Sequence, residues 1–206
     1  MRALSNSLPS TDMHVREFIE KYYPEYYSIE RYPADKTAAF CKIDQEWGIF
    51  SNFGHSPLTV GGILFDTSER LFQVMKFIDE ISRKVVYTKK GNPKMTAKHF
   101  EKEGMVRPDW GRIIVDAMKF CLMEKYRQCE EFRHELERSR GLFIVEDQTT
   151  FQKKNPDTWG AKPSVDGKEF IGPNLMGRLL MELRENGKLG YKLPDDATSF
   201  QDLANL

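Results

Sequence analysis

The chain has 206 residues, of which 40% are hydrophobic and 30% are charged, as expected for a globular protein of about one domain. Its 31 basic residues balance its 31 acidic residues, so no overall field draws it to nucleic acid or to an anionic membrane. No apolar run reaches the ~18 residues of a membrane span, and the start lacks a signal-peptide pattern. Three cysteines without a CxxC motif are typical of a reduced, cytoplasmic protein.

The N-terminal half predicts a helix and several short strands. The first ten residues are expected to form a disordered lead-in, after which Thr11 offers an N-cap for a helix that Pro24 ends. Strands are expected in "KTAAFCKI" (36–43) and "EWGIFSNF" (46–53). The stretch "SPLTVGGILFD" (56–66) predicts a hairpin that turns at two glycines.

One helix is expected over "TSERLFQVMKFIDE" (67–80), followed by an exposed basic loop over 82–98. A short helix then ends at Gly104, and apolar spacing predicts a core helix after Asp109 that continues to Gly141.

The stretch "LFIVE" (142–146) is expected to be a buried strand, and the residues from 147 to 173 a long irregular segment. A last helix starts after Asn174, and the chain from Leu189 onward is expected to be loose. The sequence thus predicts a single α+β domain, predominantly helical with a few short strands. We place it at 31–190, between an N-terminal extension with a helix (1–30) and a C-terminal tail (191–206).

Several common chemistries have no signature here. The four histidines lie far apart without an HxxxH pair, which argues against a zinc site. GxGxxG, GxxxxGK[ST] and GxSxG motifs do not occur, which argues against nucleotide-fold and serine-hydrolase sites. We therefore expect no metal and no cofactor, and any site must be built from carboxylates, lysines, amides and aromatic rings.

The predicted helix over 67–80 carries a polar stripe that has two interpretations. Glu69, Gln73, Lys76 and Glu80 share one side, with Glu69 and Lys76 about 10 Å apart along the axis. The stripe is a solvated face if Lys76 pairs with Glu80 one turn later. It is the wall of a site if Phe72, which borders the stripe, faces a pocket.

Four separated blocks of sequence together resemble the NADAR superfamily, which is named for its link to NAD and ADP-ribose metabolism. The resemblance covers roughly residues 37–187. Its blocks are "GIFSNF" (48–53), "TSERLFQVMKF" (67–77), "RPDWGRIIVDAMKFCLMEKY" (107–126) and "DTWGAKPSVDGKEFIGPNLMGRLLMELRE" (157–185). Two departures are Arg70, where the family often has His, and Ile114, where an Arg is expected.

The resemblance implies an N-glycosidic bond hydrolase. The last block is most similar to the branch that removes ADP-ribose from guanine bases of nucleic acid, as an antitoxin against DNA-modifying transferases. A second branch, the YbiA-like N-glycosidases, cleaves phosphoribosylamino-pyrimidine intermediates of riboflavin synthesis. A third interpretation is a non-catalytic ADP-ribose-binding module. The expected partner is therefore an ADP-ribose-containing nucleotide or ADP-ribosylated DNA, and no membrane.

The resemblance and the chemistry together nominate three catalytic residues. Glu69 and Asp157 are carboxylates that can stabilise an oxocarbenium-like centre, activate water or protonate a departing base. The resemblance implies that Lys76 acts covalently, through a Schiff base with the ring-opened ribose. For that, its pKa must fall below the reference ~10.4, and Arg70 and Lys162 are candidate neighbouring cations.

Ligand contacts are expected from aromatic rings, glycines and the start of the last helix. Three of these residues have a structural alternative: Trp110 could belong to the core, Asn52 could cap a turn and Asn174 could cap the last helix. In the binding interpretation, the backbone amides that follow Asn174 are free to bind a pyrophosphate. Glu146 is a further candidate carboxylate. The full expected binding set is Asn52, Phe53, Phe72, Gln73, Trp110, Trp159, Gly160, Gly172, Asn174 and Arg178. If the substrate is DNA, the expected phosphate-contacting residues are Arg83, Lys84, Lys89, Lys90, Lys94 and Lys98.

Overall fold

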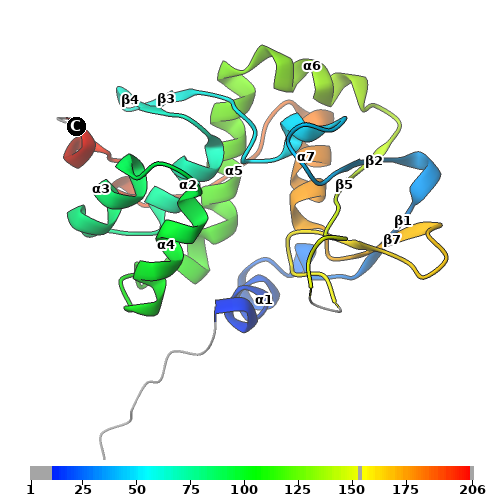
Figure 1. Cartoon of the computed structure of the whole chain (residues 1–206), viewed down its shortest axis with the longest axis horizontal. Helices are drawn as coiled ribbons and strands as arrows, with labels where there is room; N and C mark the ends of the chain where they lie inside the picture. The colour runs from blue at the N-terminus through cyan, green and yellow to red at the C-terminus, as the bar shows by residue number, and fades with distance from the viewer. Residues whose placement is uncertain (1–10, 153–154, 205–206) are drawn as a thin grey trace, which may run out of the picture.

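The computed structural model describes residues 11–152 and 155–204, with side chains from residue 15 onward. The lead-in expected over the first ten residues lies outside this range. A long helix, α5 (Trp110–Gln128), runs through the middle of the molecule, with helices on one side of it and most strands on the other (Figure 1). This is the predicted α+β domain, in which helices predominate and the strands are few and short.

Helix α5 is the core element that its apolar spacing predicts, and it buries Ile113, Ala117 and Leu122. It does not continue to Gly141, however. The backbone of Cys129 is extended (φ −108°, ψ 107°), which ends α5 and starts a separate helix, α6 (Glu130–Arg138).

Three short helices replace the expected long helix and basic loop. They are α2 (Ser68–Met75), α3 (Glu80–Thr88) and α4 (Pro93–Lys102). Each is started by a side-chain cap: Thr67 accepts from the amide of Arg70, Asp79 from that of Ser82, and Asn92 from those of Lys94 and Met95. The prediction of one helix over 67–80 was wrong because the Asp79 cap begins a new helix. The loop expected over 82–98 is mostly helical, whereas the short helix expected to end at Gly104 is confirmed as α4.

The strands form three small sheets. Strand β2 (Thr37–Phe40) pairs in parallel with β5 (Phe143–Glu146), which confirms two of the predicted strands. The predicted hairpin is also confirmed, with Gly61 (φ 57°) and Gly62 (φ 82°) in the left-handed region that such a turn requires. Its arms are β3 (Leu58–Val60) and β4 (Ile63–Phe65).

Two strand predictions differ from the structure. The stretch expected as a strand over 46–53 contains a 3-10 turn at Gly48–Phe50 instead. The segment expected to be irregular contains β6 (Lys162–Pro163) and β7 (Glu169–Gly172), and β7 pairs antiparallel with both β6 and β1 (Glu30–Pro33). Because β1 lies more than a hundred residues from β7, local patterns do not reveal this sheet.

Both ends of the described chain pack on the domain. Helix α1 (Thr11–Tyr22) packs against α5, and α7 (Leu175–Asn186) packs against β5. The segment after Leu189 is not loose, because Phe200 and Leu203 are buried and Asp202 pairs with Arg83 at 3.1 Å. None of the described helices has the length and apolarity needed to cross a membrane.

Candidate active site

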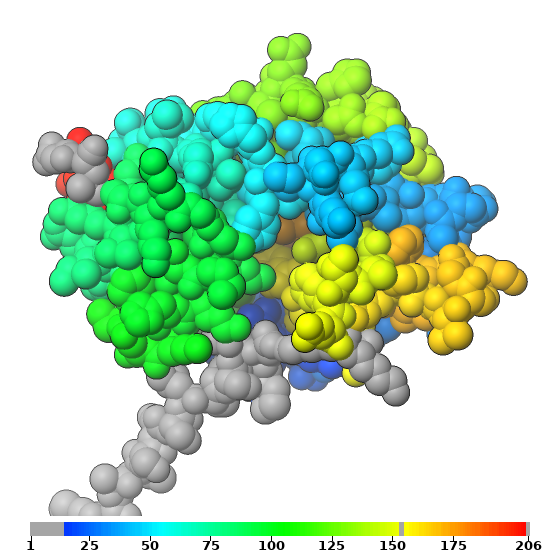
Figure 2. Space-filling model, in the orientation of Figure 1, coloured from blue at the N-terminus to red at the C-terminus, as the bar shows by residue number. Residues whose placement is uncertain are grey.

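A cavity of about 380 Å³ opens between the helical side and the strand side of the domain. Residues of α2, α4 and α5 form one wall, and the end of β5 with the segment after it forms the other. In Figure 2 the surface is hollowed between α4, in green, and the yellow segment that follows β5. The polar stripe predicted on α2 lines this cavity, so it is not a solvated face.

Helix α2 presents its polar stripe inward because the whole helix is buried. Glu69, Gln73 and Lys76 line the cavity, and the exposed fractions of Glu69 and Gln73 are 6% and 2%. Glu80 does not belong to the stripe, since it starts α3 and pairs there with Lys84. The solvated-face interpretation, in which Lys76 pairs with Glu80, is therefore wrong.

Lys76 sits at the C-terminal end of α2 and is almost fully buried. Its Nζ lies 2.5 Å from Glu101 Oε1 on α4 and 5.7 Å from the centre of the Trp110 ring. Burial lowers the pKa of Lys76, while the carboxylates of Glu101 and Glu69 oppose that shift. The lysine thus combines a buried amine with a nearby base, the combination that activates amines as nucleophiles.

Three aromatic rings form a continuous wall beside this lysine. The Phe72 ring centre lies 5.1 Å from that of Trp110 and 6.0 Å from that of Trp159. All three rings line the cavity, as does the exposed Phe53. Trp110 is both a core residue and a wall residue, so its two interpretations are compatible. A planar base or a ribose ring finds a stacking surface here.

The carboxylates of the cavity differ in their hydrogen bonds. Glu69 accepts a bond of 2.8 Å from Gln73 Nε2. Asp157 accepts from the side-chain amide of Gln148 and, at 2.9 Å, from the backbone amide of Trp159. Oε2 of Glu146, in contrast, is buried without a hydrogen-bond partner among the described residues.

The turn over 48–53 fixes the start of α2. The carbonyl of Asn52 accepts the amide of Glu69 at 3.0 Å, and its Oδ1 accepts the Ser68 hydroxyl at 2.9 Å. Buried Lys125 of α5 holds the turn by donating to the carbonyls of Ile49 at 2.6 Å and Ser51 at 2.9 Å. Asn52 lines the cavity, but its side-chain oxygen bonds Ser68 next to the turn, in line with the structural alternative of a turn cap.

Four expected ligand contacts lie outside the residues that line the cavity. Asn174 is fully buried and donates to the carbonyl of Ile144 at 2.8 Å. The amides after it, those of Leu175 and Met176, donate to the carbonyls of Thr158 and Trp159, so they are not free for a pyrophosphate. Arg178 instead bonds Ser28 and the carbonyl of Glu25.

Gly160 and Gly172 allow chain segments, rather than a ligand, to approach closely. A Cβ on Gly160 would lie 2.4 Å from the carbonyl oxygen of Glu146, and one on Gly172 would lie 2.6 Å from that of Gly160. Gly160 therefore lets the segment after Asp157 pack against the end of β5, and Gly172 lets β7 pack against that segment.

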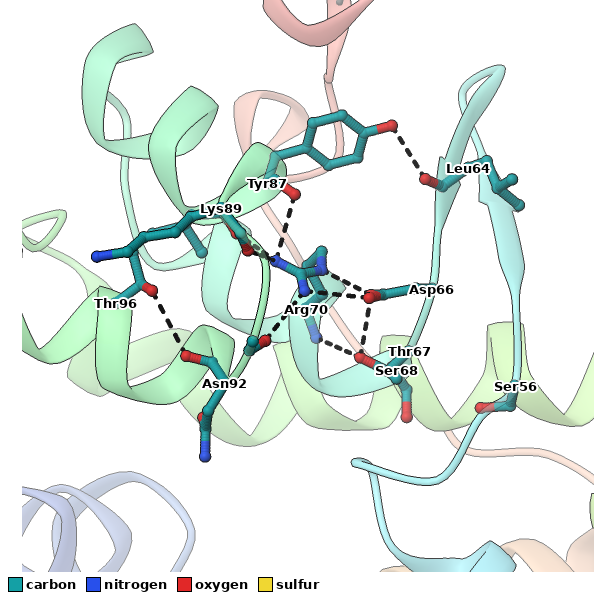
Figure 3. Close-up of polar contacts among 12 residues, drawn as sticks. Ser56, Leu64, Asp66, Thr67, Ser68, Arg70, Tyr87, Lys89, Asn92 and Thr96 are labelled. Carbon is teal, nitrogen blue, oxygen red and sulfur yellow. Dashed lines mark hydrogen bonds and ion pairs between the residues drawn. The ribbon is translucent and has the colours of Figure 1, made fainter.

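The two cations expected beside Lys76 point elsewhere. Figure 3 shows Arg70 turned toward the connection between α3 and α4, where it donates to Asp66 and to the carbonyls of Tyr87 and Lys89. Lys162 donates to the carbonyl of Phe151 at 2.6 Å. Desolvation, rather than either of these cations, is the main cause of the lowered pKa of Lys76.

The sequence did not single out several cavity residues. Glu101 was missed because it follows Lys76 by 25 positions and belongs to a helix with no motif. Val15 and Phe18 were missed because α1 was treated as an extension, although both line the cavity. Of the basic residues expected to contact phosphate, Lys94 and Lys98 lie at the cavity, whereas Arg83 is buried against Asp202.

The donor set offers no metal site among the described residues, because no three His, Cys, Asp or Glu side chains are grouped to hold an ion. The arrangement of Lys76, Glu69 and Asp157 instead allows covalent or acid–base chemistry by these side chains.

Comparison with known sequences matches residues 39–186 to the NADAR domain, a range that contains α2, α4, α5 and the end of β5. This chain belongs to the NADAR domain family. The matched range covers every cavity residue named above except Val15 and Phe18 of α1, and it confirms the resemblance seen in the four sequence blocks.

Two relatives, and the solved structure of one of them, are similar to this NADAR protein. It is 31% identical over 158 residues to the N-glycosidase YbiA of Escherichia coli, covering 76% of this chain and 92% of that protein. It is 27% identical over 185 residues to a riboflavin biosynthesis protein of Vibrio vulnificus, covering 89% of this chain and 47% of that protein. The NMR structure of E. coli YbiA is similar, with a TM-score of 0.58 over 73% of this chain and 84% of that chain. The α+β fold is thus shared.

Proposed function

We propose that this NADAR protein is an N-glycosidase that cleaves the bond between ribose C1 and a base nitrogen. The observation that carries this proposal is the buried amine of Lys76, which lies in the same cavity as Glu69, Asp157 and an aromatic wall. A pocket of this size holds a nucleoside-sized unit. The name of the E. coli relative, N-glycosidase YbiA, supports the same reaction.

The reaction proceeds through a covalent adduct of Lys76. Its neutral amine attacks C1 as the C1–N bond breaks, and the base leaves with the electron pair of that bond and receives a proton. Ring opening moves the proton of the lysine nitrogen to the ring oxygen and yields a Schiff base. Water then adds to C1 and releases the sugar as an aldehyde, which restores the lysine.

The carboxylates assist this chemistry. Glu69 stabilises positive charge at C1 during bond cleavage, and Asp157 activates the water that hydrolyses the adduct. Glu101 accepts the proton of Lys76 before attack, because it is within 2.5 Å of Nζ. In a carboxylate-only route, water would attack C1 directly and no adduct would form.

We propose ADP-ribosylated guanine of nucleic acid as the substrate. The support is the similarity of the last sequence block, "WGAKPSVDGKEFIGPNLMGRLLMELRE" (159–185), to the branch with that activity. Lys94 and Lys98 also border the cavity, are exposed, and suit the phosphates of ADP-ribose or of the DNA strand. The protein would then act on a soluble or DNA-borne substrate in the cytoplasm.

A phosphoribosylamino-pyrimidine is the second candidate substrate. Its support is the similarity to E. coli YbiA and to a riboflavin biosynthesis protein. The same cavity and the same Lys76 would act on this substrate, whose single phosphate would lie at the rim lysines, Lys94 and Lys98, in place of a pyrophosphate.

The test is incubation of the protein with each of the two substrates, in parallel with Lys76→Ala. Release of free ADP-ribose from ADP-ribosylated guanosine in DNA supports the first, and release of ribose 5-phosphate from the pyrimidine supports the second. Borohydride should trap a sugar adduct on the wild type and not on Lys76→Ala. Binding of ADP-ribose without cleavage of either substrate would leave only the binding-module interpretation.

A further inference from the structure

Glu146 ends strand β5 at the cavity, and its main chain is held from three directions. Its amide donates to Asn174 Oδ1 at 3.1 Å, and its carbonyl accepts the amide of Ala161 at 2.9 Å. The next amide, that of Asp147, donates to the carbonyl of Phe40 at 2.9 Å. Such a backbone cannot shift to relieve a poorly placed side chain, so the position of the Glu146 carboxyl group is imposed by the fold.

The side chain of Glu146 contrasts with this anchored backbone. It lines the cavity, but its Oε2 is buried without a hydrogen-bond partner among the described residues. A charged carboxylate without donors is costly to bury, whereas a neutral carboxyl group carries its own O–H donor. Asp157, which also lines the cavity, accepts one hydrogen bond from the side chain of Gln148 and one from the backbone amide of Trp159.

The charged groups near Glu146 also favour its protonated form. Burial and the nearby carboxylate of Asp157 raise the pKa of Glu146 to about 8, and Glu69 of α2 acts in the same direction. Lys94 of α4 opposes this shift. A buried carboxyl group that keeps its proton near neutral pH is suited to act as a general acid.

Resting on the proposed N-glycosidase activity, we propose that Glu146 is the general acid that protonates the departing base. As the C1–N bond breaks, the base nitrogen takes the proton of the Glu146 carboxyl group and leaves as the neutral base. Glu146 becomes a carboxylate at that moment. The water that hydrolyses the lysine adduct later returns a proton to it, so the cycle closes without another reactant.

The test compares the wild type with Glu146→Gln and with Asp147→Asn. Asp147 is adjacent in sequence but does not line the cavity, which makes it a matched control. The rate at which ADP-ribose is cleaved from guanine, or the pyrimidine base from its ribose, should fall about 100-fold or more in Glu146→Gln. It should stay within about twofold of the wild-type rate in Asp147→Asn. Adduct formation, measured by borohydride trapping, should slow equally, while affinity for free ADP-ribose stays unchanged.

The pH profile distinguishes an acid from a structural residue. The wild-type rate should fall above about pH 8 as Glu146 loses its proton. Glu146→Asp should keep a descending limb at reduced rate, and it serves as the second variant if Glu146→Gln does not fold. A wild-type profile without that fall, or a Glu146→Gln rate within threefold of the wild type, overturns the proposal. Failure of the wild type to cleave either substrate refutes the N-glycosidase function itself, and this inference with it.

Discussion

Lys76 Nζ lies 2.5 Å from Glu101 Oε1, and this ion pair joins the C-terminal end of α2 to α4 beside the cavity that both residues line. Both side chains are close to 90% buried, so the pair is little screened by solvent. Glu101 therefore influences how readily Lys76 becomes the neutral amine that attack requires.

Removal of that carboxylate should make Lys76 easier to deprotonate. Glu101 stabilises the charged amine, so Glu101→Gln lowers the pKa of Lys76 further than burial already does. The ascending limb of the rate–pH profile should move to lower pH by about one unit or more. Glu103→Gln, on the exposed end of the same helix, is the control and should leave the limb in place. A limb that stays put or moves to higher pH in Glu101→Gln contradicts this coupling.

The rim lysines should contribute to substrate binding rather than to the chemical step. Lys94→Ala and Lys98→Ala should each raise KM by roughly two- to fivefold and leave kcat within about twofold, as expected for screened ionic contacts. Lys102→Ala is the matched control, because Lys102 is an exposed lysine of α4 that does not line the cavity.

Salt separates the two candidate substrates. Activity on DNA should fall steeply with salt and less steeply in Lys98→Ala, while activity on a free nucleotide should change little. Equal salt slopes for both substrates would show that the rim lysines do not contact the DNA backbone.

Arg70 should be needed for stability and for the position of α4. Its guanidinium donates to Asp66 and to the carbonyls of Val86, Tyr87, Lys89 and Gly91, which end α3 and lead into α4 (Figure 3). Arg70→Leu removes the donor for the buried carbonyl of Val86 and for several partly buried acceptors, and it should lower the free energy of unfolding by about 3 kcal/mol.

Urea unfolding checks this prediction, with a surface pair as reference. Arg31→Leu removes an exposed ion pair with Glu169 and should change the free energy of unfolding by less than about 1 kcal/mol. Equal effects of the two variants would show that the carbonyl contacts of Arg70 contribute little.

Lys125 should make stability depend on pH above neutrality. Burial lowers its pKa in the folded protein to about 7, whereas the unfolded chain keeps the proton up to about pH 10.4. Between these values the unfolded state binds more protons, so this lysine makes the protein more stable as pH rises. The measurement is the difference in unfolding free energy between the wild type and Lys125→Met at pH 7, 8 and 9. It should change in favour of the wild type, and a flat or opposite trend would show that Lys125 stays charged.

Local patterns predicted those parts of the protein that depend on near neighbours in sequence. The hairpin at Gly61-Gly62, strand β5 and the apolar face of α5 were all predicted because their signals lie within a few residues. The same holds for the helical spacing that places Glu69 and Lys76 on one side of α2. The cap at Asp79 was overlooked, so α2 and the first residue of α3 were joined into one predicted helix, and the rest of α3 was predicted as a loop. The short helix expected to end at Gly104 corresponds to α4.

What the sequence determined by itself is the α+β class, the family blocks and the pairing of an acid and an amine on one helix. Tertiary structure decided which groups surround them: Glu101 comes from α4, Glu146 from a parallel strand pair, and the amides at the start of α7 are already bonded to Thr158 and Trp159. The protonation state of a side chain, its burial and the availability of hydrogen-bond donors depend on contacts between residues tens of positions apart. The periodicity of a single helix or strand does not predict such contacts.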